Sequence, residues 1–391
     1  MRIESVDFFY LSMPEVQDVG DGSQDAALVR VRAGGFEGWG ECEAAPLPTI
    51  AAYVCPMSHS ACKPVKASVE GMPLQTPGDI AAIGKRVHEH SFDLLQADHT
   101  LSGIDIALWD LLGKYLGEPV YSLLGYQQAY PKLPYASQLF GGTPEQTYEK
   151  AVQSRQTGYR AVKFGWGPIG RSTAAVDEAH FRAAREGLGK DAYLMVDIGT
   201  YWVEDVVAAK QRLAVLHEVG AFWLEEPFAN MALDAYSQLA VAQPRVPLAA
   251  GEGCNNFVQA AAMMNHADLR FIQIDTGRIG GITPAKRVAD MAKAKEITYV
   301  NHTFTSHLAL SASLQPYAGI AEDVICEYPV EPKQLALDIT TNHLAIDGNG
   351  EVAAPDRAGL GMDVCIEKIK DYVVDTEIVV NGVTIYQTPA F

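Results

Sequence analysis

Three short apolar runs between Ala192 and Glu252 constrain this chain more than any other feature of its sequence. The runs are AYLMVD, AFWLEEP and VPLAAGE, and each is typical of a buried strand that ends in a carboxylate, namely Asp197, Glu225 and Glu252. The acids are almost equally spaced, with a helix-length segment between each pair. At matching ends of successive parallel strands they would repel one another unless a positive charge lay between them. The stretch therefore predicts a site for a divalent cation.

The alternation of strand and helix extends over the whole chain after about Tyr130. Eight apolar runs are predicted as parallel strands, with seven amphipathic segments between them as helices. This pattern favours a closed (β/α) barrel over an open doubly wound sheet, and no GxGxxG follows the first strand to indicate a dinucleotide site. The predicted strands are 133–139, 161–164, 193–197, 222–225, 247–252, 271–275, 298–302 and 324–327. The predicted helices are 145–155, 177–188, 203–219, 233–242, 257–264, 284–294 and 308–317.

Residues before and after the barrel are predicted to form a second, smaller domain. Three antiparallel strands are expected at 3–11, 27–33 and 36–43, and a helical pattern follows over 77–117. The tail carries Asn-Gly turn signals and is expected to return to this domain. The predicted fold is an α/β barrel with an α+β capping domain, in which the chain divides into a cap over 1–130, a barrel over 131–330 and a C-terminal segment over 331–391 that rejoins the cap.

The charge balance excludes several classes of partner. The chain has 391 residues, of which 48% are hydrophobic, and its formal net charge is −18. Neither nucleic acid nor an anionic membrane is therefore expected to bind it. No apolar run approaches the length of a membrane span, and residues 1–7 do not resemble a signal segment, so we expect a cytoplasmic protein. The six cysteines include no CxxC pair, which is typical of reduced thiols rather than a zinc site or a disulfide framework.

Seven of the eight predicted strands end in an ionisable residue. Any one of these residues alone is more often a helix cap, a solvated loop residue or a structural histidine. Their joint occurrence is hard to explain in this way, because the strand interiors are otherwise almost wholly apolar. Barrel enzymes keep their active sites at the C-terminal ends of the strands. The predicted ring of site residues is Lys163, Asp197, Glu225, Glu252, Asp275, His302 and Glu327.

These motifs resemble those of the enolase superfamily, in its mandelate racemase subgroup, over essentially the whole chain. LSGIDIALWD resembles a helix of the subgroup's capping domain, and IDTGRIGG with VNH resembles its Asp and His dyad. VD, WLEEP and GE resemble its three metal-binding strand ends. The resemblance implies a (β/α)7β modified TIM barrel in which Asp197, Glu225 and Glu252 bind Mg²⁺, an ion that prefers such hard oxygen ligands. The muconate cycloisomerase subgroup would instead have a lysine at Asp275.

The resemblance also implies a mechanism. Removal of the proton next to a carboxylate creates an enediolate, and Mg²⁺ can stabilise its charge. His302 is the expected base, with Asp275 orienting its ring, and the imidazolium could then protonate a leaving β-hydroxyl. Glu327, in ICEYP, resembles an acid that hydrogen-bonds the substrate carboxylate, which requires it to be protonated or strongly hydrogen-bonded. A simple ion pair with an arginine or a lysine of a loop is the alternative role for Glu327.

The second predicted strand departs from the subgroup's pattern. Many members carry Lys-x-Lys there, whereas AVKFGWGPIG matches Lys163 to the first lysine and Gly165 to the second. Racemisation needs an acid or base on both faces of the α-carbon, so the glycine disfavours it. Lys163 is expected to contact the carboxylate or to act as a second acid or base. We therefore expect a Mg²⁺-dependent dehydratase that converts an acid sugar to a 2-keto-3-deoxy acid, with a cycloisomerase of an anhydro-sugar acid or lactone second and a racemase or epimerase third.

Further expectations concern specificity, the other functional classes and assembly. The irregular loops 14–25 and 44–64 are where we expect specificity to lie. A metal-dependent hydrolase would need HxH on the first barrel strand, which reads KLPYASQL. A barrel without catalytic activity is disfavoured because the three strand-end acids and the Asp-His dyad are all present. We expect a homo-oligomer whose partner is a small-molecule carboxylate. Candidate substrate contacts just beyond strand ends are Trp166, Tyr201, Asn255, Arg278 and His307, of which His307 is alternatively a helix cap.

Overall fold

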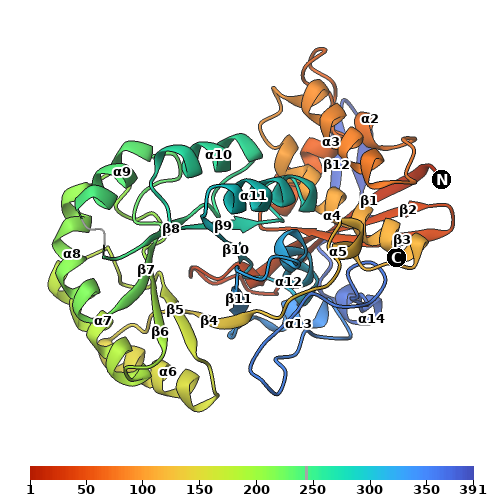
Figure 1. The fold of residues 1–391 in the computed structure, drawn as a ribbon. Helices are drawn as coiled ribbons and strands as arrows, with labels where there is room; N and C mark the ends of the chain where they lie inside the picture. Colours follow the sequence, from red (N-terminus) through yellow and green to blue (C-terminus); the bar gives the residue numbers. More distant parts are fainter. Residues whose placement is uncertain (243–244) are drawn as a thin grey trace.

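A computed structural model describes residues 1–242 and 245–391, in which eight parallel strands form a nearly closed barrel covered by helices (Figure 1). The strands neighbour one another in the order β10-β9-β8-β7-β6-β5-β4-β11. The predicted barrel is confirmed, with seven long helices between its strands in the described part of the chain. The strands are β4 (Leu133–Leu139), β5 (Ala161–Gly165), β6 (Tyr193–Asp197), β7 (Ala221–Glu225), β8 (Leu248–Ala250), β9 (Phe271–Asp275), β10 (Thr298–His302) and β11 (Ile325–Pro329). The helices are α6 (Pro144–Gln156), α7 (Ala174–Leu188), α8 (Val206–Glu218), α9 (Leu233–Ala242), α10 (Phe257–His266), α11 (Ile282–Ala294) and α12 (His307–Leu314).

The interior of the barrel is packed with side chains. Each strand contributes one residue to a separate apolar cluster, which combines the small side chains of Ala161 and Ala249 with large aromatic ones. The strands are buried on both sides, and they therefore read as nearly continuous apolar runs. The interior residues are Tyr135, Ala161, Met195, Trp223, Ala249, Phe271, Val300 and Ile325.

One junction of the barrel is held by a side chain. Strands β10 and β11 are not paired by a backbone ladder in the described residues. Asn301 of β10 lies between them: its Oδ1 accepts from the Glu327 N–H at 2.9 Å, and its Nδ2 donates to the Glu327 carbonyl at 3.4 Å. Tyr317 and Ser313 hold the amide of Asn301 in place. Closure of the barrel therefore depends on a polar residue that an apolar strand would not be expected to contain.

Helices α7 and α8 are joined by a buried ion pair. Arg212 Nε donates to Asp177 Oδ2 at 2.9 Å, and the two side chains are only 5% and 0% exposed. The second oxygen of Asp177 accepts from the Gly170 N–H at 3.1 Å. Since Gly170 lies in the loop that follows β5, this pair connects the outer helices to the mouth of the barrel.

Replacing Asp177 with asparagine is expected to lower the free energy of unfolding by about 3–5 kcal/mol, because it leaves the Arg212 charge buried without a partner. Urea denaturation followed by circular dichroism measures the change. The adjacent Glu178→Gln substitution is the matched control, since it disrupts an exposed pair with Arg182 that is expected to contribute little. Equal losses in the two variants would contradict the assigned role of the buried pair.

The cap is built on the antiparallel sheet β1-β2-β3 and a long helix, α4. A side chain at Gly40 of β3 would collide with the Gly103 carbonyl of α4, so this glycine allows the helix to approach the sheet closely. The strands are β1 (Ile3–Ser12), β2 (Asp25–Ala33) and β3 (Phe36–Cys42), and the helices are α1 (Pro46–Val54), α2 (Lys66–Val69), α3 (Pro77–Ser91), α4 (Ala97–Leu116) and α5 (Val120–Leu123). The segment 44–64 is only partly irregular, because its proline-rich start forms α1 with Pro46 in the first turn, where proline is tolerated.

Polar contacts fix the cap over the C-terminal ends of the barrel strands. Asp105 of α4 accepts from the Thr283 hydroxyl at 2.5 Å, and Trp109 Nε1 donates to the same hydroxyl oxygen at 2.9 Å. The Glu43 N–H, directly after β3, donates to the Gly277 carbonyl of the loop that follows β9 at 3.2 Å. These contacts place the end of β3 at the mouth of the barrel.

The C-terminal tail contacts β1 and β2. Tyr386 donates to the Phe8 carbonyl at 2.7 Å, and Phe391 stacks on Phe9 with ring centroids 4.4 Å apart. The domain boundaries at 130 and 330 stay a prediction. In the described chain, no helix combines the length and apolar character that crossing a membrane requires. The elements of the tail are α13 (Gln334–Asp338), α14 (Ile366–Ile369), β12 (Glu377–Val380) and β13 (Val383–Gln387).

Candidate active site

A pocket with a cavity volume of about 230 Å³ lies between the cap and the C-terminal ends of the barrel strands. Its walls combine two groups of residues that are far apart in the sequence. The cap contributes Gly20, Asp21, Gly22 and Glu43, and the barrel contributes Ser137, Gln138, Leu139, Lys163, Gly165, Trp166, Asp197, Glu252, Arg278, His302 and Phe304.

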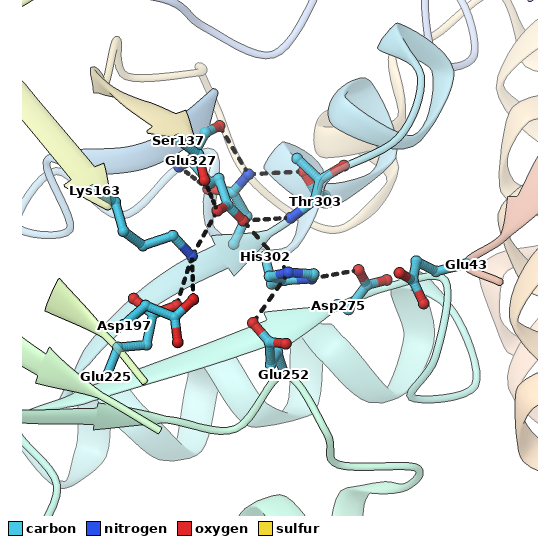
Figure 2. Close-up of polar contacts among 12 residues, drawn as sticks. Glu43, Ser137, Lys163, Asp197, Glu225, Glu252, Asp275, His302, Thr303 and Glu327 are labelled. Atoms are coloured by element: carbon cyan, nitrogen blue, oxygen red, sulfur yellow. Dashed lines mark hydrogen bonds and ion pairs between the residues drawn. The ribbon is translucent and has the colours of Figure 1, made fainter. Parts of the chain in front are cut away.

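His302 ends β10 and lies between carboxylates from neighbouring strands, as Figure 2 shows. Its Nδ1 donates to Asp275 Oδ2 at 2.7 Å, which the register of β9 and β10 explains, since the two residues are directly paired. Its Nε2 is 3.0 Å from Glu252 Oε2 and 3.9 Å from Glu327 Oε2. Burial alone would lower the pKa of His302, but Glu252, Glu327 and Asp275 raise it to about 10. The ring is thus oriented by Asp275 and turns its other nitrogen toward Glu252 and Glu327.

Lys163 of β5 is the centre of a second buried group (Figure 2). Its Nζ lies 2.5 Å from Glu225, 2.8 Å from Glu327 and 3.9 Å from Asp197. Burial would lower the pKa of Lys163, but Glu225 and Glu327 hold it well above its ordinary value. Burial, followed by repulsion from Glu225, raises the pKa of Asp197 well above its ordinary value despite Lys163. Several acids therefore share one lysine, and their negative charge is not fully compensated.

Glu327 of β11 is fully engaged. Its Oε1 accepts from the Ser137 hydroxyl at 2.7 Å and its Oε2 from the Thr303 N–H at 2.7 Å, in addition to the contact with Lys163. Burial would raise the pKa of Glu327, but Lys163 and His302 lower it below its ordinary value. Glu327 is accordingly a strongly hydrogen-bonded carboxylate, and its cationic partner comes from a strand rather than from a loop.

The three strand-end acids have the donor chemistry of a magnesium site. Asp197 ends β6, Glu225 ends β7 and Glu252 follows β8, so adjacent strands present three hard oxygen ligands. Burial and neighbouring acids raise the pKa of Glu225 as well as that of Asp197, although Lys163 acts in the opposite direction. As the side chains stand, no three His, Cys, Asp or Glu residues in the described ranges form a metal-binding group. The acids fit a hard divalent cation by their chemistry, and Glu225 and Glu252 would have to turn from Lys163 and His302 to bind it.

A steric constraint explains why residue 165 is a glycine. A Cβ atom at this position would lie 2.5 Å from Asp197 Oδ2. The glycine thus leaves room for a carboxylate at the place where the resemblance would put a second lysine. Of the described residues that line the pocket, Lys163 is the only lysine.

Two of the five expected substrate contacts, Trp166 and Arg278, line the pocket. The other three are not among the residues that line it, and their role as substrate contacts stays a prediction. Tyr201 is exposed and lies under the Arg171 guanidinium, and Asn255 is also exposed. His307 begins α12, where its Nδ1 accepts from the Leu344 N–H at 3.2 Å and its ring stacks on His343. A position just beyond a strand end does not determine which way a side chain points, which is why the sequence could not separate these residues.

The cap residue Glu43 was not predicted to belong to the site. Its Oε2 accepts from Arg278 Nε at 2.5 Å, and its carbonyl accepts from His99 Nε2 at 2.7 Å. Burial would raise the pKa of Glu43, but Arg278 lowers it. A polar signal was present in the sequence, because Glu43 directly follows a buried strand in GECE. The expectation that loop 14–25 contributes to specificity is consistent with Gly20, Asp21 and Gly22 in the pocket wall.

Comparisons with known proteins agree with this architecture. Residues 146–369 match the family described as Enolase C-terminal domain-like, and residues 19–125 match the Mandelate racemase / muconate lactonizing enzyme, N-terminal domain. The crystal structure of a predicted mandelate racemase from Rhodobacter sphaeroides is similar over 100% of both chains, with 58% identity and a TM-score of 0.95.

Two curated proteins are similar over shorter stretches. D-galactarolactone cycloisomerase from Agrobacterium fabrum is 28% identical over 70% of this chain and 73% of its own length. L-talarate/galactarate dehydratase from Salmonella typhimurium is 30% identical over 60% of this chain. That match spans only 55% of the dehydratase, so it does not extend to the whole of that protein.

Proposed function

Because the chain belongs to the mandelate racemase/muconate lactonizing enzyme family of the enolase superfamily, we propose that it is a lyase that removes the α-proton of an acid sugar and expels the β-hydroxyl to give a 2-keto-3-deoxy acid. The observation that carries the proposal is the dyad of His302 and Asp275. His302 lines one pocket with Lys163, Asp197 and Glu252, and Lys163 contacts the buried Glu225. These are the groups that proton abstraction next to a carboxylate requires.

Each charged residue of the site has a separate role in the proposed reaction. Asp197, Glu225 and Glu252 would hold Mg²⁺, which when bound supplies positive charge to the carboxylate oxygens on which negative charge develops. Lys163 supplies a second positive charge to the same carboxylate. Glu327, already a carboxylate with Lys163 and Thr303 as partners, holds Lys163 in position instead of binding the substrate carboxylate directly.

His302 moves the protons. Its Nδ1–H is held by Asp275, so Nε2 is the nitrogen available to accept the α-proton once the ring is neutral. The resulting imidazolium is stabilised by Asp275 and can donate the same proton to the β-hydroxyl, which leaves as water. The enol that remains tautomerises to the 2-keto acid.

Elimination fits this pocket better than racemisation. A racemase needs a second acid or base opposite His302, and Gly165 has no side chain to supply one. Lys163 is engaged with Glu225 and Glu327 at 2.5 and 2.8 Å, which favours a fixed electrostatic role. A cycloisomerase is the second candidate, because D-galactarolactone cycloisomerase matches 70% of the chain. In that reaction the same residues act and the expelled oxygen belongs to a ring.

Incubation with a library of acid sugars, anhydro-sugar acids and sugar lactones in D₂O with Mg²⁺ tests the proposal. A dehydratase is expected to give a 2-keto acid that has lost one water and gained one solvent deuterium at C3. A cycloisomerase would give a 2-keto acid isomeric with its substrate, and a racemase an isomer without the keto group. The absence of both product and α-deuterium exchange across the library would contradict the proposed function.

A further inference from the structure

One side of the pocket carries a charge pattern that bears on the substrate. It is formed by Asp21 and Glu43 of the cap and by Arg278, which follows β9, and Figure 2 shows Glu43 and Lys163 on opposite sides of His302. Arg278 Nε donates to Glu43 Oε2 at 2.5 Å, and its Nη1 lies 3.7 Å from Glu252 Oε1. The guanidinium is thus already between two carboxylates.

Asp21 adds a second acid to the same region. Its Oδ1 accepts from the N–H and hydroxyl of Ser23 at 2.9 and 2.5 Å. Its Oδ2 lies 3.7 Å from Lys333, which does not line the pocket. This side of the pocket accordingly presents two carboxylates and one engaged arginine, whereas Lys163 lies among Glu225, Glu327 and Asp197.

We propose that this pocket selects acid sugars with a single carboxylate and an uncharged hydroxylated tail, open or closed into a ring, and discriminates against open-chain diacids. The inference rests on the proposed function and specifies its substrate class. A diacid bound by one carboxylate at Lys163 would bring the other toward Asp21 and Glu43, where like charges repel it.

Hydroxyl groups suit the same wall. They donate hydrogen bonds to the carboxylates of Asp21 and Glu43 and accept from the arginine, so an uncharged tail satisfies both kinds of partner. A second carboxylate can only accept, so it has no proton to donate to Asp21 or Glu43 and would lie against both carboxylates even where Arg278 contacts it. A diacid whose second carboxyl is closed into a lactone carries one charge and belongs to the accepted class.

The test compares an aldonate, the aldarate of equal chain length and the monolactone of that aldarate with the wild-type enzyme and Mg²⁺. The values of kcat/KM for the aldonate or the monolactone are expected to exceed that for the aldarate by roughly tenfold or more. Equal or greater activity on the open aldarate would overturn the inference and leave the proposed function intact. If none is turned over, the wider library decides the proposed function, and a thermal shift with the three compounds ranks their binding. Tightest binding of the aldarate would overturn the inference.

A charge-neutral variant tests the assigned cause. Glu43→Gln keeps the size of the side chain but frees the charge of Arg278, so the ratio of aldarate to aldonate kcat/KM is expected to rise by roughly tenfold. Glu37→Gln, an exposed position on the same strand β3, is the matched control and should leave the ratio unchanged. An unchanged ratio in folded Glu43→Gln would exclude Glu43 as the determinant, and if this variant does not fold, the wild-type comparison decides.

Discussion

Replacing His302 with asparagine is expected to lower kcat by about 10²- to 10⁴-fold, the usual contribution of a positioned general base. Asparagine can still donate to Asp275, which His302 contacts at 2.7 Å, but it cannot accept a proton at neutral pH. Steady-state kinetics with the acid sugar found in the library measures the loss. Exchange of the α-proton in D₂O should disappear together with turnover, because both need the same base.

The matched control for this variant is His307→Asn, the same substitution five residues later. His307 contacts Leu344 and His343 outside the pocket, so its kcat is expected to remain close to that of the wild type. The Mg²⁺-dependent change in melting temperature should persist in His302→Asn, which separates a lost base from a misfolded site. Substantial turnover by His302→Asn would exclude His302 as the base, and loss in both variants would point to a structural effect.

Mg²⁺ is expected to stabilise the wild-type enzyme, and Glu225→Gln is expected to abolish this effect together with activity. A ligand at about one hundred times its Kd stabilises the folded state by roughly 2.7 kcal/mol, which corresponds to a Tm increase of a few degrees. Glu225 is 0% exposed, its second oxygen accepts from Trp223 Nε1 at 2.7 Å, and it contacts Lys163 of the pocket wall, so the substitution acts on a buried acid next to the pocket. Differential scanning fluorimetry with Mg²⁺ and with EDTA measures the shift.

Glu218→Gln provides the control for the metal experiment. Glu218 is an exposed acid on α8 that pairs with Arg182, so its loss should leave the Mg²⁺ response intact. A wild-type Tm that responds to neither Mg²⁺ nor EDTA would contradict the assignment of Asp197, Glu225 and Glu252 as ligands. A full Mg²⁺ response in Glu225→Gln would exclude Glu225 alone.

The barrel could be predicted because its strands are buried on both faces. That burial makes each strand a continuous apolar run, against which a terminal Asp275 or His302 stands out. The register of the strands then brings the strand ends together, because residues at equal positions on neighbouring parallel strands are adjacent, as Asp275 and His302 are. The proximity of these groups followed from local pattern, whereas their proposed roles depend on experiment.

The remainder of the site depends on contacts that no local pattern contains. Glu43 reaches the pocket only because α4 and the loop after β9 hold the cap in place. His302 and His307 are both near the end of β10. The ring of His307 points away from the pocket because helix α12 starts at this residue, which the local sequence pattern does not reveal. The charge of Glu327 likewise depends on Lys163, which lies six barrel strands earlier in the chain but close in the sheet, because only β4 separates β5 from β11.

The junction between β10 and β11 has a mechanical consequence. It is the place in the described barrel where neighbouring strands lack a ladder, and it separates the strand of His302 from the strand of Glu327. Any opening of the barrel would begin most easily there and would change the separation of these two residues, now 3.9 Å between Nε2 and Oε2. The amide of Asn301 therefore helps to fix the separation of His302 and Glu327, although its hydrogen bonds to Glu327 are made to the backbone of that residue.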